Sequence, residues 1–103
     1  MRFLRKQFLS MKISIQDSFL FALNSQVNFI ARDKPSASRK FKSDLLRNIK
    51  KHLKQPFHFQ KSKDFEDENI RDYVFKGYVS IYEIDLERDI VTVFSFIKYK
   101  DTL

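Results

Sequence analysis

The sequence contains no cysteine and no tryptophan, and it has one glycine and two prolines among 103 residues. Without cysteine the chain can form neither a disulfide nor a thiolate metal site, and it has no thiol nucleophile. This absence is compatible with a reducing compartment. One glycine cannot build the glycine-rich loop that cradles a phosphate. Disulfide-stabilised, thiol-dependent and phosphate-loop proteins are therefore excluded.

Long apolar runs are also missing. No stretch approaches the roughly 20 consecutive apolar residues that a membrane-spanning helix needs. Residues 1–10 lack the uninterrupted apolar segment of a secretory signal, because Arg5, Lys6 and Gln7 break it. We therefore expect a cytoplasmic protein that has no membrane partner.

Histidine occurs only as His52 and His58. The two are not spaced as a helical ligand pair, and the acidic cluster at residues 64–68 is adjacent to neither. A serine nucleophile would need a neighbouring base and an orienting acid, and the sequence suggests neither. We expect no metal and no other cofactor.

Apolar side chains are abundant, by contrast. Phenylalanine contributes 12 residues, and 43% of the chain is hydrophobic. This composition is typical of a folded protein, and the length suffices for one core. We expect a single domain over residues 1–103, with residues 1–7 as an N-terminal extension. Met11 is an alternative start of the compact domain.

The net charge of +7 is unevenly distributed. Residues 1–63 hold 15 Lys/Arg and 3 Asp/Glu, a net +12, whereas residues 64–103 hold 5 Lys/Arg and 10 Asp/Glu, a net −5. The basic half is suited to an anionic partner such as nucleic acid, a ribosome or an acidic protein segment. A solvated, lysine-rich helix surface is the alternative interpretation.

Hydrophobic periodicity predicts three elements in the first half. Apolar side chains alternate over residues 8–15, which indicates a strand. They recur every three or four residues over about 17–31 and again over 35–54, which indicates two helices. Each helix has one apolar stripe, so we expect an antiparallel hairpin. The expected helix N-caps are Asp17 or Ser18, and Asp33.

The second half begins with an irregular stretch, residues 57–69, in which Phe65 is expected to be held in place. Three strands follow at 70–75, 78–85 and 90–99. The first two are joined by Lys76-Gly77, a hairpin signal. The fold class is therefore α+β with the order β-α-α-β-β-β, a helix hairpin covering one face of a small, mainly antiparallel sheet. The expected core is Leu20, Leu23, Val27, Ile30, Phe41, Leu45, Ile49, Leu53, Ile81, Val91, Val93 and Ile97.

Several motifs resemble those of RelE/ParE toxins. Residues 35–41, Pro-Ser-Ala-Ser-Arg-Lys-Phe, are similar to the Pro-x-Ala-x-x-x-Phe that begins the second helix of that superfamily. Residues 70–82 resemble its Val-Arg-Glu-Leu, short turn, Tyr-Arg-Ile-x-Tyr hairpin. Two family residues differ here, because Val79 replaces the arginine of the third strand and Lys98 replaces a terminal histidine. The resemblance covers about residues 11–100 and is closer to the ParE-like branch.

The resemblance implies the toxin component of a type II toxin–antitoxin system, with roles in growth inhibition and plasmid stabilisation. It implies a cognate antitoxin as partner. A ParE-like toxin would inhibit DNA gyrase by binding it, with no reaction of its own. A RelE-like toxin would instead be an endoribonuclease that acts on mRNA in the ribosome.

Catalytic candidates follow from the nuclease alternative. Cleavage by the RNA 2′-hydroxyl requires proton transfer and stabilisation of charge on the phosphate. The candidate residues are Arg71, Lys98, Tyr99 and Lys100.

Arg71 is suited to bidentate phosphate binding. A solvated lysine is charged at neutral pH, however, so Lys98 would be a poor proton acceptor. Gyrase is therefore the preferred target and the ribosome with mRNA the alternative. A further reading is a simple nucleic-acid-binding domain that uses the lysine-rich second helix. The alternative explanation of the catalytic candidates is structural: their cations would only keep the strand ends soluble.

Overall fold

The computed structural model describes residues 11–99. Its elements in chain order are β1 (Lys12–Ile15), α2 (Asp17–Ala31), α3 (Pro35–His52), the short 3-10 helix η1 (Pro56–His58), β2 (Ile70–Phe75), β3 (Tyr78–Asp85) and β4 (Ile90–Lys98). This confirms the predicted α+β class and the order β-α-α-β-β-β. The expected N-terminal extension, residues 1–7, and the first three residues of the predicted first strand lie outside the described residues.

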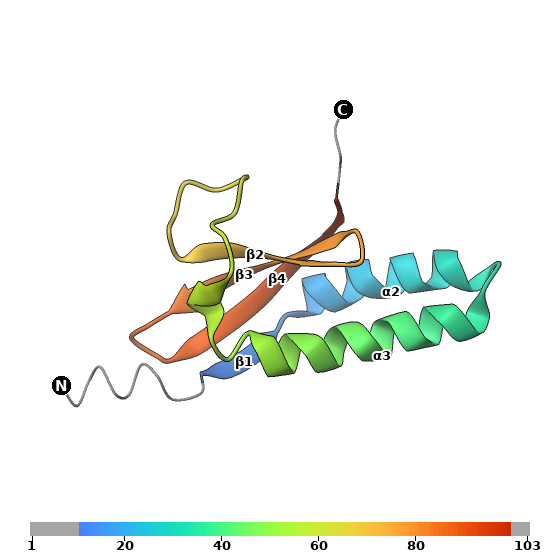
Figure 1. Cartoon of the computed structure of the whole chain (residues 1–103), viewed down its shortest axis with the longest axis horizontal. Helices are drawn as coiled ribbons and strands as arrows, with labels where there is room; N and C mark the ends of the chain where they lie inside the picture. Colours follow the sequence, from blue (N-terminus) through green and yellow to red (C-terminus); the bar gives the residue numbers. More distant parts are fainter. Residues whose placement is uncertain (1–10, 100–103) are drawn as a thin grey trace.

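The four strands form one sheet in the order β1-β4-β3-β2. Strands β2, β3 and β4 are an antiparallel meander, and β1 runs parallel to β4 at the far edge. Helices α2 and α3 pack against each other on one face of this sheet (Figure 1). A parallel pair needs a long crossover connection, and the path through the helix hairpin and back across the sheet supplies it.

The core lies between the helix hairpin and the sheet. Phe19 of α2 meets Phe96 of β4 edge to face, with ring centroids 5.5 Å apart. The fully buried side chains of this cluster are Phe19, Leu23, Leu45, Ile49, Leu53, Tyr82, Ile84, Val91 and Val93. Leu20, Val27 and Phe41 pack against the cluster but are only partly buried, and Ile30 is likewise only partly buried. The helix faces of the predicted core are thus largely confirmed.

Ile97 was wrongly placed in the core, because it is 41% exposed. The strand register explains the error. Ile81 pairs with Ser95 and Tyr82 pairs with Val93, so Phe94 is an extra residue in β4. Such a β-bulge reverses the alternation of the side chains that follow it. Phe96 therefore faces the helices, and Ile97 faces the opposite side of the sheet.

The predicted helix caps are also wrong. The N-cap position of α2 is Gln16, one residue before Asp17, and that of α3 is Lys34, one residue after Asp33. Neither Gln16 nor Lys34 makes a side-chain cap hydrogen bond. The Ser18 hydroxyl instead donates to the carbonyl oxygen of Phe94, 2.9 Å away. The Ser18 side chain was predicted to cap the helix, but it instead makes a tertiary hydrogen bond with β4.

None of the helices formed within residues 11–99 is both long enough and apolar enough to cross a bilayer.

The β2–β3 hairpin turns through Lys76 and Gly77, whose φ angles are +50° and +85°. Both values are positive, as a type I′ turn requires, and this turn matches the twist of the strands on either side. No atom comes within 4 Å of a Cβ built on Gly77. Glycine is therefore needed here for its backbone conformation and not for space.

We expect Gly77→Ala to lower the free energy of unfolding by about 1 kcal/mol, because alanine is strained at positive φ. Lys76→Asn is the matched variant and should leave stability equal or slightly higher, since asparagine tolerates this conformation. Urea denaturation measures both. A Gly77→Ala protein as stable as the parent would contradict the assigned turn.

Candidate functional site

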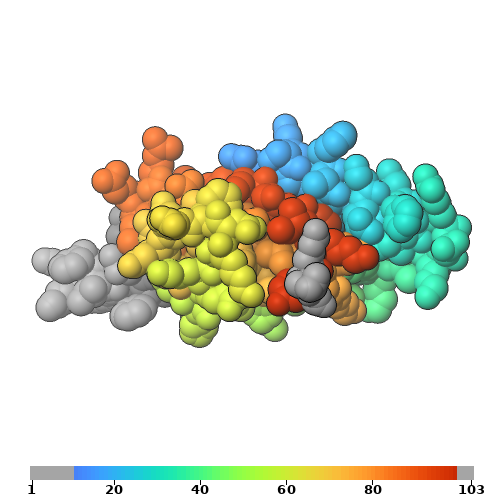
Figure 2. All heavy atoms as spheres, turned by 90° about the horizontal axis from the view of Figure 1, so that it is seen from above, coloured from blue at the N-terminus to red at the C-terminus, as the bar shows by residue number. Residues whose placement is uncertain are grey.

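The face of the sheet away from the helices is partly open. Val74 of β2, Val79 of β3 and Ile97 of β4 are paired across the strands and form an apolar row there. The segment between η1 and β2, residues 59–69, rises on this side in Figure 1. Seen from above in Figure 2, that segment (yellow) lies beside the end of β4 (red). One edge of the open face is thus walled by the irregular segment.

Residues 61 and 62 attach this segment to the edge of β2. Lys61 forms an antiparallel bridge with Arg71, and the Ser62 N–H donates to the Ile70 carbonyl at 2.8 Å. Phe65 contacts Phe94, the bulged residue of β4, with ring centroids 5.8 Å apart. The expectation that Phe65 is held in place is confirmed, although its ring stays partly exposed.

A hollow of about 620 Å³ lies between this segment and the end of β4. Two of the predicted site residues, Lys98 and Tyr99, border it. The Tyr99 N–H donates to the Gly77 carbonyl at 2.8 Å, which fixes the backbone there. The Lys63 ammonium lies 5.8 Å from the centre of the Tyr99 ring. The full lining is Gln60, Lys63, Asp64, Asp72, Val74, Val79, Ile97, Lys98 and Tyr99.

Arg71 lies elsewhere. It pairs with Tyr82, whose side chain is in the core, so alternation places Arg71 on the helix face of β2. Its Nε donates to the Glu68 carbonyl and its Nη1 to the Phe59 carbonyl, both at 2.8 Å. The guanidinium also lies 5.0 Å from the centre of the Phe57 ring. These contacts tie the irregular segment to the sheet.

The structure therefore brings together only part of the predicted set. Lys98 and Tyr99 border the hollow, Arg71 does not line it, and Lys100 lies outside the described residues. Sequence reasoning missed Lys63 and Asp72, which also line the hollow. Lys63 lies in a stretch with no periodicity, so the sequence held no signal for it. Asp72 lies between Ile70 and Val74 in the period-2 pattern of β2. A carboxylate at an otherwise apolar position of a strand was a usable signal.

Tyr82 connects the core to η1. Its hydroxyl donates to the Pro56 carbonyl at 2.6 Å, in a buried setting. Burial raises the pKa of the Tyr82 phenol well above its usual value, and the positive charge of Arg71 offsets part of that effect. The phenol is therefore held neutral as a hydrogen-bond donor.

Replacing Tyr82 by phenylalanine should lower the free energy of unfolding by about 1 kcal/mol near pH 7, because the Pro56 carbonyl loses its donor. The pKa of Tyr82 is raised on folding. Its stabilising effect is therefore complete below the unfolded-state pKa, about 10, and is lost as the pH rises above it. Parent stability should fall above about pH 10, and less so in Tyr82→Phe. Tyr99→Phe, at an exposed ring, is the control. Equal alkaline losses in parent and Tyr82→Phe would contradict the assignment.

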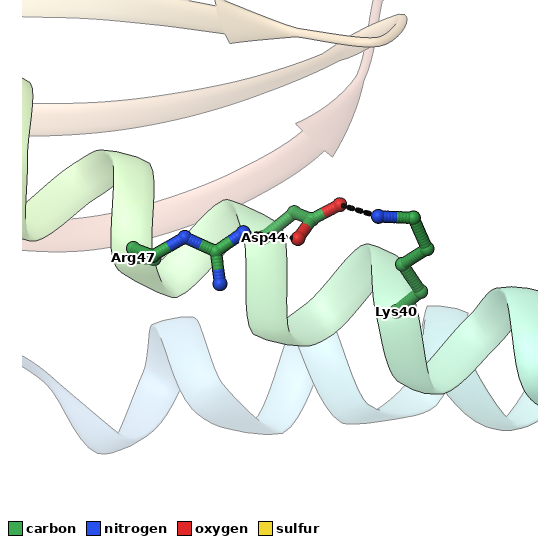
Figure 3. Close-up of polar contacts among 3 residues, drawn as sticks. All are labelled: Lys40, Asp44 and Arg47. Atoms are coloured by element: carbon green, nitrogen blue, oxygen red, sulfur yellow. Dashed lines mark hydrogen bonds and ion pairs between the residues drawn. The ribbon is translucent and has the colours of Figure 1, made fainter.

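The exposed side of α3 is cationic. Lys40 and Arg47 both bond to the Asp44 carboxylate, Lys40 at 3.0 Å, and all three side chains are drawn in Figure 3. Hydrogen bonds from Lys40 and then Arg47 hold the pKa of the Asp44 carboxyl below its usual value. The exposed cations of α3 and its end are Arg39, Lys40, Arg47, Lys50, Lys51 and Lys54. One carboxylate offsets only part of this charge, so the helix offers a basic surface.

The two histidines have aromatic surroundings. His52 lies 6.1 Å from the ring centre of Tyr73 and 6.5 Å from that of Phe59, and His58 lies 6.4 Å from the Phe59 ring. Within residues 11–99 no group of three or more His, Asp or Glu side chains is placed to hold a metal ion.

Comparison with known proteins identifies the family. Residues 13–101 match the model of the ParE toxin of the type II toxin–antitoxin system parDE. No curated protein matches the sequence.

Solved structures share the fold. A chain of the chromosomal ParDE toxin–antitoxin system from P. aeruginosa superposes with a TM-score of 0.71 at 11% identity, covering 88% of this chain and 98% of that one. A chain of the RelBE2 toxin–antitoxin complex from Mycobacterium tuberculosis gives 0.63 at 14% identity, covering 90% and 95%. The isolated E. coli RelE toxin gives 0.51 at 13% identity, covering 90% and 88%. The family match spans most of the sequence, and the chain belongs to the ParE toxin family of type II toxin–antitoxin systems.

Proposed function

We propose that the chain is a ParE-like toxin that inhibits DNA gyrase by binding it and that a cognate antitoxin neutralises it. The position of Arg71 carries this proposal. RNA cleavage needs a phosphate-binding cation and proton-transfer groups around one phosphate. Here the Arg71 guanidinium donates to two backbone carbonyls of the irregular segment, and Arg71 does not line the hollow that Lys98 and Tyr99 border. Inhibition by binding needs no such convergence.

Two further observations support this target. The family model that matches the sequence is that of the ParE toxin. The ParDE chain also superposes with a higher TM-score than the isolated RelE toxin, 0.71 against 0.51. Gyrase and ribosomes are both cytoplasmic, so the proposed function places the chain in the cytoplasm.

The proposed antitoxin would cover basic and apolar surface. The neighbouring structures are described as a ParDE system and a RelBE2 complex. In this chain the exposed side of α3 is cationic, and a shallow groove between α2 and α3 is lined by residues that include Val27, Leu46 and Lys42. An acidic segment with apolar side chains on one side would complement both features.

The antitoxin proposal is tested by co-expression with the neighbouring reading frame. The expected result is that the toxin alone stops growth, and that the second protein restores growth and co-purifies with it. A chain that is harmless alone and binds no adjacent gene product would contradict the proposal.

The target is tested on purified protein freed from its antitoxin. We expect inhibition of gyrase supercoiling and trapping of cleaved DNA, without mRNA cuts on translating ribosomes. Inhibition by binding needs no catalytic side chain. Lys98→Ala and Arg71→Lys should therefore each retain gyrase inhibition.

The RelE-like nuclease is the second candidate because Lys63, Lys98 and Tyr99 gather at one hollow. Cations beside an aromatic ring are suited to RNA phosphate and base. Ribosome-dependent cuts that disappear in Lys98→Ala or Tyr99→Ala, with gyrase unaffected, would replace the gyrase proposal by this one.

A further inference from the structure

One buried oxygen of a carboxylate that lines the hollow has no hydrogen-bonding partner among the described residues. Asp72, in β2, is 8% exposed and lines the hollow. Its Oδ1 is buried and has no hydrogen-bond partner among residues 11–99. The ion pairs within those residues join Lys40 and Arg47 to Asp44 and Arg88 to Asp85, so none involves Asp72. A buried carboxylate without a partner is unfavourable, so a cation that reaches it and pairs with it is bound favourably.

The walls of the hollow select the kind of cation. Val74, Val79 and Ile97 give an apolar floor, and Val74 and Ile97 are each more than one-third exposed. Tyr99 adds an aromatic ring that is 45% exposed. Asp64 and Gln60 also line the hollow, but residues 11–99 hold no group of three or more His, Asp or Glu side chains placed to bind a metal ion, so a small hydrated ion would find no oxygen cage. An arginine side chain matches each part, because its hydrocarbon stem packs on apolar surface while its planar guanidinium pairs with a carboxylate and stacks on a ring.

We propose that this hollow binds one arginine side chain presented by a segment of a partner protein. The rim includes Lys63 and Lys98, and their charge disfavours a run of basic residues. The segment that fits best therefore has an isolated arginine, an apolar neighbour on the valine floor and an acidic residue facing the rim lysines. This site is independent of the proposed target, since it requires only the open face of the sheet.

The test uses the ¹⁵N-labelled full chain and the peptide acetyl-Glu-Leu-Arg-amide. Titration should give saturable shifts of the amide signals of Val74, Val79, Ile97 and Tyr99. Acetyl-Glu-Leu-Gln-amide, which lacks the cation, should bind about tenfold more weakly or worse. Guanosine 5′-monophosphate is the third probe and reports on a nucleotide site instead.

Variants locate the binding. Asp72→Asn should weaken binding of the arginine peptide about tenfold, because the shape stays and the charge is lost. Glu83→Gln is the matched control, since Glu83 faces the same side of the sheet but does not line the hollow. Equal peptide binding in parent and Asp72→Asn would overturn the proposal. Shifts that depend on Asp72 and arise with the nucleotide but not with the peptide would also overturn it.

A second variant keeps the test decisive if Asp72→Asn does not fold. Val74→Lys places an ammonium two residues from Asp72 on the same face of β2, where it can pair with the carboxylate. We expect it to block the peptide and raise the melting temperature. A Val74→Lys protein that still binds the peptide like the parent would contradict the proposal.

Discussion

Leu45→Ala should lower the free energy of unfolding by about 2–5 kcal/mol, because it leaves a cavity in a packed core. Leu45 is fully buried between the helix hairpin and the sheet, as is Ile49 one turn later on α3. A domain of this size has about 5–15 kcal/mol of total stability, so the variant would lose much of it. Chemical denaturation monitored by circular dichroism measures the change.

The matched control for Leu45→Ala is Lys50→Ala on the same helix. Lys50 is exposed, so its truncation should change the free energy of unfolding by less than about 0.5 kcal/mol. Ile49→Ala should behave like Leu45→Ala. Losses below about 0.5 kcal/mol at both buried positions would mean that α3 presents a different face to the core.

Arg71→Met should lower the free energy of unfolding by about 2–3 kcal/mol and loosen the irregular segment. The change removes two charge-assisted hydrogen bonds to the carbonyls of Phe59 and Glu68 while keeping an apolar stem. Two backbone acceptors then lose their donor, and the contact with the Phe57 ring is weakened. Denaturation gives the global effect, and amide exchange over residues 59–69 should accelerate.

Two controls separate this structural role from a direct action on a target. Arg71→Lys keeps the charge but not the fork of donors, so its loss should be intermediate. Arg88→Met, at an exposed turn with a 3.9 Å ion pair to Asp85, should cost less than about 0.5 kcal/mol. An Arg71→Met protein that is as stable as the parent yet has lost toxicity would show that Arg71 contacts the target instead.

Because Arg71 holds the wall of the hollow, its effects extend beyond stability. The segment it anchors carries Gln60, Lys63 and Asp64, which line one side of that cavity. Loss of activity on mutating Arg71 is therefore no proof of catalysis by itself. Stability and exchange measurements have to accompany each activity assay at this position.

The periodicity of the sequence determined the elements and their order. Alternation in β2 and β3 and the three-to-four spacing in α2 and α3 each arise from neighbours along the chain, so local reasoning reads them correctly. The same holds for the turn at Gly77, where the residue type reports a backbone angle. The strand bounds of β2 and β3 agree with the prediction at both ends.

Only the tertiary structure decided which face of the sheet each later side chain occupies. The bulge at Phe94 moves Ile97 out of the core, and it arises from the pairing of β4 with β3. The hydrogen bonds of Ser18 and Arg71 likewise go to residues that periodicity does not connect to them. The hollow combines β2, β3, the end of β4 and an irregular segment. Such features depend on contacts between segments far apart in the chain, and a local pattern of hydrophobicity carries no information about those contacts.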